Sequence, residues 1–493
     1  MLLSAAVLVC ALAAPASAFD VTVAGQWEFA YGYLGNGTFK DSAHGHYSED
    51  NGNRFLARIR TRTQLDFIAS ESLRAVLMFE IGEMDYGHNG DGKASGAGLN
   101  TDGNNVATKL AYLEWMLPGT EAVMRMGLQE VALPSTPMGS PVLAADVAGI
   151  LLSSPVAGPL SATAFWIRPF DSIVTGDDDR NVSDEMDVFG LLLPIEGEGW
   201  SVTPWGMYSF IGTGSGYYDY TYLDDGFEDV SITAKDSRAK AYWIGLHSEF
   251  SPVDNLAINL EAIYGRLNSA DIRGFGGELD GTQAMSNHFS TEGWFLGMTV
   301  DYEMEWGTPG VFGWYSSGDK ANSDHSGRYG RLPVLGNDGG SFGPTTFGTA
   351  GTFGVGTDGA ILGTGTGTWG VGVQLADVTF IPDLSHTLRL AYYRGTNDPD
   401  LVRKGYAAGE VPNYMPYTAD GFYLTDKDYA FEVNFDHSYV VNDNLSLVLE
   451  LGYIHLRADK GVWRNQTDRD PARGLGSRSD DAYKVEFNLL FEF

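Results

Sequence analysis

The chain has 493 residues, of which 63 are glycine, 13% are aromatic and only 43% are hydrophobic. A helical membrane protein needs apolar runs of about 18 residues or more, and beyond the N-terminus this sequence has none. The net charge of −33 argues against nucleic acid or an anionic surface as a partner.

The first 18 residues form an apolar run that ends in Ala16-Ser17-Ala18, which predicts a signal peptide with an Ala-x-Ala cleavage site. The only cysteine, Cys10, lies in this run, so we expect the mature chain to contain no disulfide. We expect residues 19–493 to form a single domain. The first strand-like run starts a few residues after the cleavage site, which leaves no room for the plug domain of a ligand-gated transporter.

The rest of the chain alternates between strand-like runs, short turns and long loops. This rhythm predicts an all-β transmembrane antiparallel barrel of about 18 strands, with short periplasmic turns and long extracellular loops. Sixteen strands is the alternative, because the runs 148–154 and 160–168 have the weakest patterns. A barrel of this size encloses an aqueous channel. The predicted strands are 21–33, 54–68, 72–84, 108–117, 121–130, 148–154, 160–168, 185–194, 200–211, 239–250, 256–266, 291–302, 309–317, 368–381, 387–396, 428–440, 445–457 and 482–493.

The last run, from Ala482 to Phe493, shows the alternation most clearly. Its odd positions are apolar, from Tyr483 to Phe493, and its even positions are mostly polar. A polar inner face and an apolar outer face are typical of strands in a membrane barrel. The terminal aromatic residue resembles the signal that outer-membrane barrels present to the barrel assembly machinery.

Three arginines mark the predicted strand 54–68 as the most informative for function. Arg58, Arg60 and Arg62 occupy even positions and therefore form one column. An arginine that faces lipid near the midplane costs roughly 2–4 kcal/mol, so we expect this column to face the channel.

Pairing through a turn near residue 70 would place Arg60 opposite Glu80 and Asp66 opposite Arg74. We expect these residues to line the pore together with Arg125. Arg389 is a further inward cation. Two interpretations stay open: the arginines line a functional constriction, or they belong to a structural lattice of ion pairs.

The overall layout, the segment Ala376–Asp398 and the C-terminal strand resemble the homotrimeric outer-membrane porins of sulfate-reducing bacteria. The resemblance implies a trimer of channels in the outer membrane, in contact with lipid and lipopolysaccharide, that admits small hydrophilic solutes including sulfate. It identifies no pore residue.

In trimeric porins the third long loop folds inward, and here that loop is 131–147, with Glu130 and Asp146 as its available acids. An inward fold that narrows the pore stands beside two alternatives, a loop packed on the rim and a loop at a subunit contact. The Gly/Thr-rich loop 318–367 lies either outside the barrel or folded over its mouth.

The five arginines favour a porin for passive diffusion with a preference for anions. The acidic loops oppose this, since they would enrich cations at the mouth and make the porin cation-preferring. A substrate-specific channel, for a sugar or another solute, is a further alternative, although the inward aromatic residues Tyr112, Phe165 and Trp243 form no track.

The nine histidines are scattered, and none has a spacing that suggests a catalytic triad, so we do not expect an enzyme. We expect no cofactor. Clustered carboxylates at Asp177-Asp178-Asp179 and Asp224-Asp225 could bind Ca²⁺, but they lack regular ligand spacing and are more simply explained as solvated loops.

Overall fold

The structure is a computed structural model of the chain. The 18 residues predicted as a signal peptide lie outside the part that it describes, as does Asp177-Asp178-Asp179. The described residues are 19–37, 39, 53–88, 97–99, 106–171, 185–212, 215, 217, 233–234, 239–268, 272–273, 286–287, 290–321, 328–336, 340–347, 361–408, 417–418, 421–459, 461–463 and 479–493.

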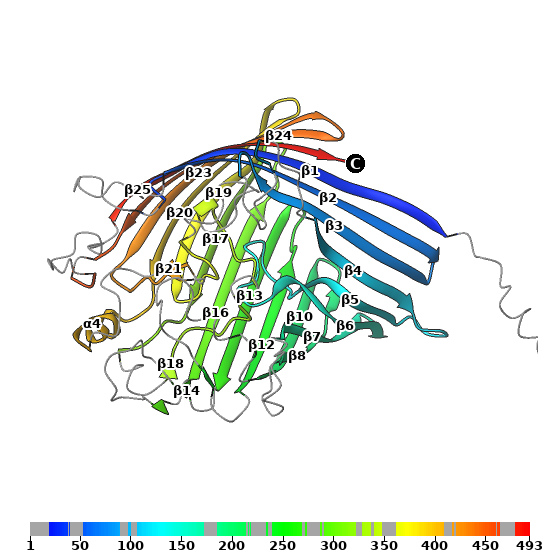
Figure 1. Cartoon of the computed structure of the whole chain (residues 1–493), viewed down its shortest axis with the longest axis horizontal. Coiled ribbons are helices and arrows are strands. Elements are labelled where there is room, and N and C mark those ends of the chain that lie inside the picture. The colour runs from blue at the N-terminus through cyan, green and yellow to red at the C-terminus, as the bar shows by residue number, and fades with distance from the viewer. Residues whose placement is uncertain are drawn as a thin grey trace, which may run out of the picture.

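Eighteen antiparallel strands, each paired with the next along the chain, form the wall of the molecule (Figure 1). They are β1 (Asp20–Gly35), β2 (Arg54–Ser70), β3 (Leu73–Asp85), β4 (Val106–Met116), β5 (Val123–Ala132), β6 (Ala144–Ala157), β7 (Leu160–Asp171), β8 (Glu185–Leu192), β10 (Trp200–Ile211), β12 (Ala239–Phe250), β13 (Leu256–Asn268), β16 (Ser290–Tyr302), β17 (Thr308–Ser316), β19 (Thr368–Ile381), β20 (Leu384–Gly395), β23 (Tyr429–Asn442), β24 (Leu445–Arg457) and β25 (Ser479–Glu492).

The sheet closes on itself because β1 also pairs with β25, from Gln26 opposite Glu492 to Gly35 opposite Tyr483. The predicted barrel of 18 strands is therefore confirmed, and the alternative of 16 is wrong. The run 148–154 belongs to the longer strand β6, which begins inside the segment predicted as a loop.

The remaining strands are short. β9 (Ile195–Gly197) continues β8 along β10, and β18 (Arg328–Tyr329) pairs in parallel with β16. The remaining small strands are β11 (Thr233–Ala234), β14 (Ile272–Arg273), β15 (Ser286–Asn287), β21 (Tyr417–Thr418) and β22 (Gly421–Phe422).

The helix α4 (Pro399–Ala408) lies at the end of the barrel opposite the C-terminus (Figure 1). The sequence explains its start, since the Asp398 carboxylate accepts a hydrogen bond from the Asp400 N–H and Pro399 supplies the first helical φ. No helix among the described residues has the length and hydrophobicity to cross a membrane.

Tight connections at the C-terminal end of the barrel follow from local backbone chemistry. β19 and β20 are joined by Pro382 and Asp383 alone, since Ile381 already pairs with Leu384. Proline presets a turn, and aspartate tolerates the left-handed conformation that Asp383 adopts at φ +63°. Such turns cannot move far, so they fix the register of the strands that they join.

Exposure alternates along each strand as the sequence predicts, with the polar face turned inward. On β25, Lys484, Glu486 and Asn488 are buried, whereas Val485 and Phe487 are exposed. A soluble protein buries its apolar face instead. The outside of this barrel is thus an apolar surface, which suits hydrocarbon rather than water.

The largest hydrophobic cluster lies inside the barrel. Trp243, Phe295 and Trp314 project from the inner faces of β12, β16 and β17, and pack with Met138 and Phe342 from two connecting segments. The inner wall from β12 to β17 is therefore largely apolar and covered by chain. The part from β20 through β25 to β5 carries most of the charged inner side chains.

Closure at β1 leaves no room for a side chain at Gly25, where a Cβ would overlap the carbonyl oxygen of Arg62 and press on the ring of Phe493. We expect Gly25→Val to lower the free energy of unfolding by about 1–3 kcal/mol, as overpacking does. Urea unfolding in lipid vesicles measures this. The control is Ala24→Val, one residue earlier at an exposed position. Equal midpoints for the two variants would contradict the tight closure.

Candidate functional site: the barrel lumen

The predicted arginine column lies on the inner face of β2 and is fully engaged in ion pairs. Arg60 contacts the Glu28 carboxylate on β1 at 2.5 Å and Glu83 on β3 at 3.3 Å. Arg58 contacts Asp85 at 2.6 Å. We call the inner face of β1–β5 the charged wall.

The remaining predicted cations are paired as well. Arg62 contacts Glu80 at 2.7 Å. Arg74 and Arg125 approach the two oxygens of one carboxylate, Glu114 on β4, at 2.7 and 2.6 Å. Burial of these charges without partners would be costly, and the pairs remove that cost.

The register predicted between the second and third strands is wrong by two residues. Glu80 lies opposite Arg62 rather than Arg60, and Arg74 lies two residues beyond its predicted partner, Asp66. The physical reason is the turn, which consists of residues 71–72 and is therefore centred further along than residue 70.

Asp146 does not line the lumen. It lies on β6 next to Val147, whose buried side chain belongs to the interior cluster, so alternation turns Asp146 to the opposite face. There it forms an ion pair with Lys109 of β4. The prediction failed because the strand begins at Ala144, earlier than its sequence pattern suggested.

Residues 133–143, the part of the predicted third loop that lies between β5 and β6, cross the lumen. The N–H of Thr136 donates a hydrogen bond to Glu261 on β13, on a part of the wall that is not adjacent to β5 or β6. Met138 and Val142 are buried in the interior cluster. Of the three predicted positions for this loop, the inward one is observed.

The described parts of the Gly/Thr-rich loop 318–367 also lie inside the barrel. At one end, the carbonyls of Pro333 and Val334 accept hydrogen bonds from Trp243 and Tyr217, both at 2.7 Å. Contacts with these two fully buried side chains, one of them on the inner face of β12, do not fit a loop that lies outside the barrel.

At the other end, a carboxylate on β23 holds this loop. Glu432 is fully buried and accepts hydrogen bonds from Thr345 Oγ1 at 2.7 Å and Phe347 N at 2.9 Å. Asn434 Nδ2 and the Tyr393 hydroxyl complete its shell at 2.8 and 3.0 Å. Four donors stabilise the ionised form of a carboxylate.

The two inserted segments bind each other. Ser341 N donates to the Ser140 carbonyl at 2.9 Å, and Gly343 N donates to the Met138 carbonyl at 2.7 Å. Gly139 allows this approach, because it has φ +87° and a Cβ there would overlap the Ser341 carbonyl. We call residues 133–143 and 340–347 together the strap.

The strap packs on the apolar half of the wall, is anchored at one end on β23, and leaves the charged wall partly exposed. The side chains of Arg62, Arg74 and Arg125 keep 25%, 42% and 32% of their exposure. Lys484 and Glu450 on β25 and β24, by contrast, are almost fully buried. Water inside the barrel therefore has its access along β2–β5.

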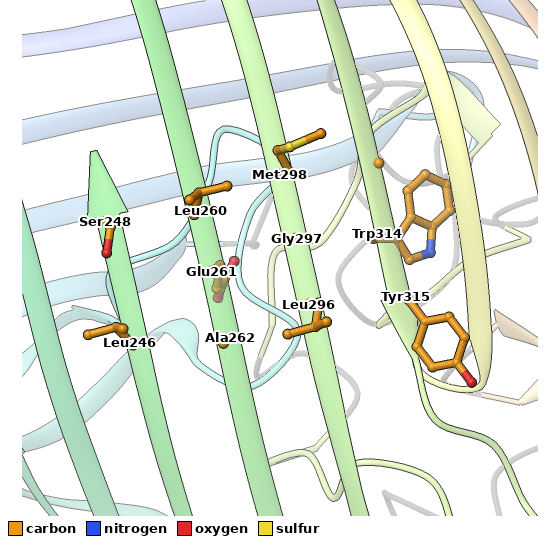
Figure 2. Close-up of a pocket in the computed structure, with 11 residues that line it drawn as sticks. Leu246, Ser248, Leu260, Glu261, Ala262, Leu296, Gly297, Met298, Trp314 and Tyr315 are labelled. Atoms are coloured by element: carbon orange, nitrogen blue, oxygen red, sulfur yellow. The ribbon is translucent and has the colours of Figure 1, made fainter. Parts of the chain in front are cut away.

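A hollow of about 450 Å³ lies between β12 and β17 (Figure 2). Its rim residues Leu246, Leu260, Leu296 and Tyr315 are among the exposed hydrophobic side chains, so it opens on the outer face of the barrel. It is not the channel.

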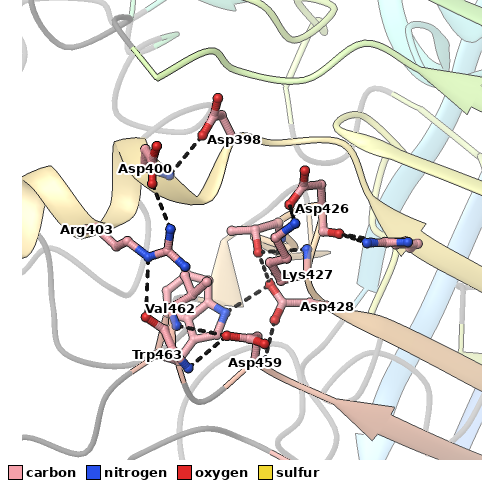
Figure 3. A network of polar contacts seen from close by, with 12 residues as sticks. Asp398, Asp400, Arg403, Asp426, Lys427, Asp428, Asp459, Val462 and Trp463 are labelled. Carbon is pink, nitrogen blue, oxygen red and sulfur yellow. Dashed lines mark hydrogen bonds and ion pairs between the residues drawn. The ribbon is translucent and has the colours of Figure 1, made fainter.

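A network of aspartates ties loops together at the end of the barrel that carries α4 (Figure 3). Buried Asp428 accepts hydrogen bonds from Thr425 N and Oγ1, from Trp463 Nε1 and from Asp459 N, at 2.6–2.9 Å. Asp459 in turn accepts from the N–H of Val462 at 3.1 Å. These aspartates are engaged in loop structure.

No group of three or more His, Cys, Asp or Glu side chains within the described ranges is arranged to hold a metal ion. Both predicted Ca²⁺ positions, Asp177-Asp178-Asp179 and Asp224-Asp225, lie outside those ranges. Ca²⁺ binding there stays a prediction.

Sequence reasoning missed the anchoring carboxylates Glu261 and Glu432 and the acidic partners Glu28 and Glu114. Glu28, Glu261 and Glu432 occupy inward positions of strands whose other inward residues are mostly small or polar, whereas Glu114 shares the inward face of β4 with Leu110 and Tyr112. Alternation could have placed them in the lumen, but only the closed fold shows what they contact.

No family model matches the sequence, and no curated protein matches it. Several crystal structures of outer-membrane channels are similar in shape. OpdL of Pseudomonas aeruginosa is 12% identical with a TM-score of 0.48, over 96% of this chain and 99% of that chain. OccAB3 of Acinetobacter baumannii is 11% identical with a TM-score of 0.49, over 96% and 100%.

A BenF-like porin from Pseudomonas fluorescens Pf-5 is 10% identical with a TM-score of 0.48, over 96% of this chain and 99% of that chain. At these identities and TM-scores the similarity does not assign the chain to a family.

Asp428→Ala would leave four donors without their acceptor, and unpaired buried donors are costly. We expect the amides of residues 459 and 461–463 to exchange with solvent at least about tenfold faster. Hydrogen–deuterium exchange measures this. Asp400→Ala is the control, because it removes an exposed aspartate that pairs with Arg403 on α4. Equal exchange in both variants would show that Asp428 does not hold the network.

Proposed function

We propose that the chain is an outer-membrane porin that forms a water-filled channel for passive diffusion of small hydrophilic solutes. One observation carries the proposal. A closed barrel with an apolar outer face keeps a row of ionised side chains partly exposed inside, along β2–β5. Such an interior supports a polar path across a membrane.

The path runs between the charged wall and the strap, which narrows it. Because the strap covers the apolar half of the lumen and the wall at β23, solutes would pass along the arginines of β2–β5 and their carboxylate partners. The two interpretations of the arginine column are therefore compatible. The arginines form a lattice of ion pairs, and this lattice lines the proposed path.

Ion pairing also bears on selectivity. Each of the five arginines has a carboxylate partner, so the charged wall presents alternating charge rather than a positive surface. We therefore propose weak discrimination between anions and cations, with sulfate as one permeant solute among others. A stronger preference, for anions, for cations or for one substrate, would have to come from outside the charged wall.

Assembly and export complete the proposal. The resemblance to trimeric porins supports a homotrimer in contact with lipopolysaccharide, a cleaved signal peptide, and recognition of the strand that ends at Phe493 by the assembly machinery. Cross-linking of the purified protein tests the trimer, since a ladder that stops at three subunits is expected.

The pairing predicts opposite effects for the two members of one pair. Arg62→Ala leaves the Glu80 carboxylate without its partner and should shift selectivity toward cations, whereas Glu80→Gln should shift it toward anions. One unpaired charge about 7 Å from the path changes the permeability ratio by about threefold. The reversal potential in a planar bilayer under a KCl gradient, repeated with sulfate, measures both shifts.

Arg403→Ala is the matched control, because Arg403 pairs with Asp400 on α4 rather than on the wall. Shifts of the same sign for the two charged-wall variants would contradict the proposed path. A purified protein that produces no conductance steps would overturn the porin itself.

A further inference from the structure

The two ends of the strap are held with very different strength. At β23, Glu432 accepts four hydrogen bonds, two of them from the strap itself, Thr345 and Phe347. At β13, Thr136 N donates a single hydrogen bond of 3.3 Å to Glu261 Oε2. The β23 end is therefore an anchored end, and the β13 end is a weak one.

The surroundings of Glu261 add to this difference. Its side chain is 3% exposed, and its Oε1 has no hydrogen-bond partner among the described residues. Thr136 Oγ1 and His247 Nε2 are buried and lack partners in the same way, and His247 lies directly opposite Glu261 on β12. Buried polar atoms without partners cost free energy, so the seated position of the loop is stabilised less than its burial suggests.

At this point of the wall the loop packs against a glycine. The β16 residue opposite Glu261 is Gly297, which presents no side chain to the loop (Figure 2). A Cβ at that position would lie 3.3 Å from Met138 Cε and 3.6 Å from Glu261 Oε2, so the loop and the carboxylate share the space above the glycine. The hydrogen bond from Thr136 is the directional contact that fixes the loop there.

We propose that the strap is a tether with one fixed end and one releasable end, and that Glu261 is the positioning residue that seats loop 133–143 across the lumen. When the Thr136–Glu261 bond breaks, loop 133–143 leaves β13 together with the residues 341 and 343 that bind it, while Thr345 and Phe347 stay on β23. That release widens the pore rests on the proposed porin function. The release of the loop from β13 does not depend on that function.

Thiol labelling tests the position of the loop directly. Thr136→Cys and Thr346→Cys place one buried thiol at each end of the strap, and both keep the backbone N–H that binds the wall. A Cys10→Ser background removes the one native cysteine. The probe is a neutral, water-soluble maleimide, applied to the protein in lipid vesicles.

In the Glu261→Ala background we expect labelling at position 136 to become about tenfold faster or more, since the hydrogen bond that holds the loop on β13 is lost. Labelling at position 346 should change less than about twofold. Glu261→Gln is the matched control, because an amide oxygen still accepts the Thr136 N–H; it should restore protection at position 136.

Three results would overturn the proposal: continued protection of position 136 in Glu261→Ala, equal release in Glu261→Gln, or equal release at both ends. If Glu261→Ala does not fold, Thr136→Pro removes the donor and leaves Glu261 intact, with Met138→Cys as the labelled position. Release of Met138→Cys supports the tether, and continued protection rejects it. Since labelling needs no transport, an absence of current in every variant would refute the porin and not the tether.

Discussion

Pairing between β1 and β25 closes the sheet, and the rest of the structure depends on it. Closure satisfies the backbone hydrogen bonds of both edge strands and divides every strand into an inner and an outer face. Because the even residues of β2 and β25 then point inward, the arginines and the buried glutamates come to share one interior. A lipid-facing position would have made each of these charges destabilising.

Inside the barrel, charged side chains on one side of the lumen need partners, and apolar side chains on the other side need cover from water. Charges on the wall from β20 to β5 are neutralised by neighbours on adjacent strands, such as Arg60 with Glu28. Apolar residues on the wall from β10 to β19 would face water if the lumen were empty. The strap covers them with Met138 and Phe342, so the interior cluster acts as a core. The part of the lumen left to water is the charged part.

Sequence patterns were sufficient to predict the strands. They were insufficient to predict which side chains contact each other inside the barrel. Period-2 alternation identified the 18 strands. It also predicted that Arg58 on β2 and Glu486 on β25 point into the barrel, because alternation depends only on neighbouring residues of one strand. The partner of Arg62 depended on a turn one residue further along than expected. The contacts of Glu261 and Glu432 join residues about 90 to 125 positions apart, and no local pattern encodes such a pair.

The same reasoning explains why selectivity was the hardest property to predict. A column of arginines suggests a positive surface when it is considered alone. In the structure each arginine is paired with a carboxylate. The net charge that a solute meets is therefore the sum of the two opposite charges of a pair. Ion pairs and inserted loops, rather than the composition of one strand, therefore decide what the lumen offers.

Whether the water path follows the charged wall is the central question, and modification of single cysteines under voltage answers it most directly. Gln64→Cys on β2 and Ile263→Cys on β13 place thiols on the charged and the strap-covered walls. A water-soluble thiosulfonate reagent should reduce the current through the first variant and leave the second unchanged. Equal block of both would mean that the strap does not occupy the apolar half of the lumen.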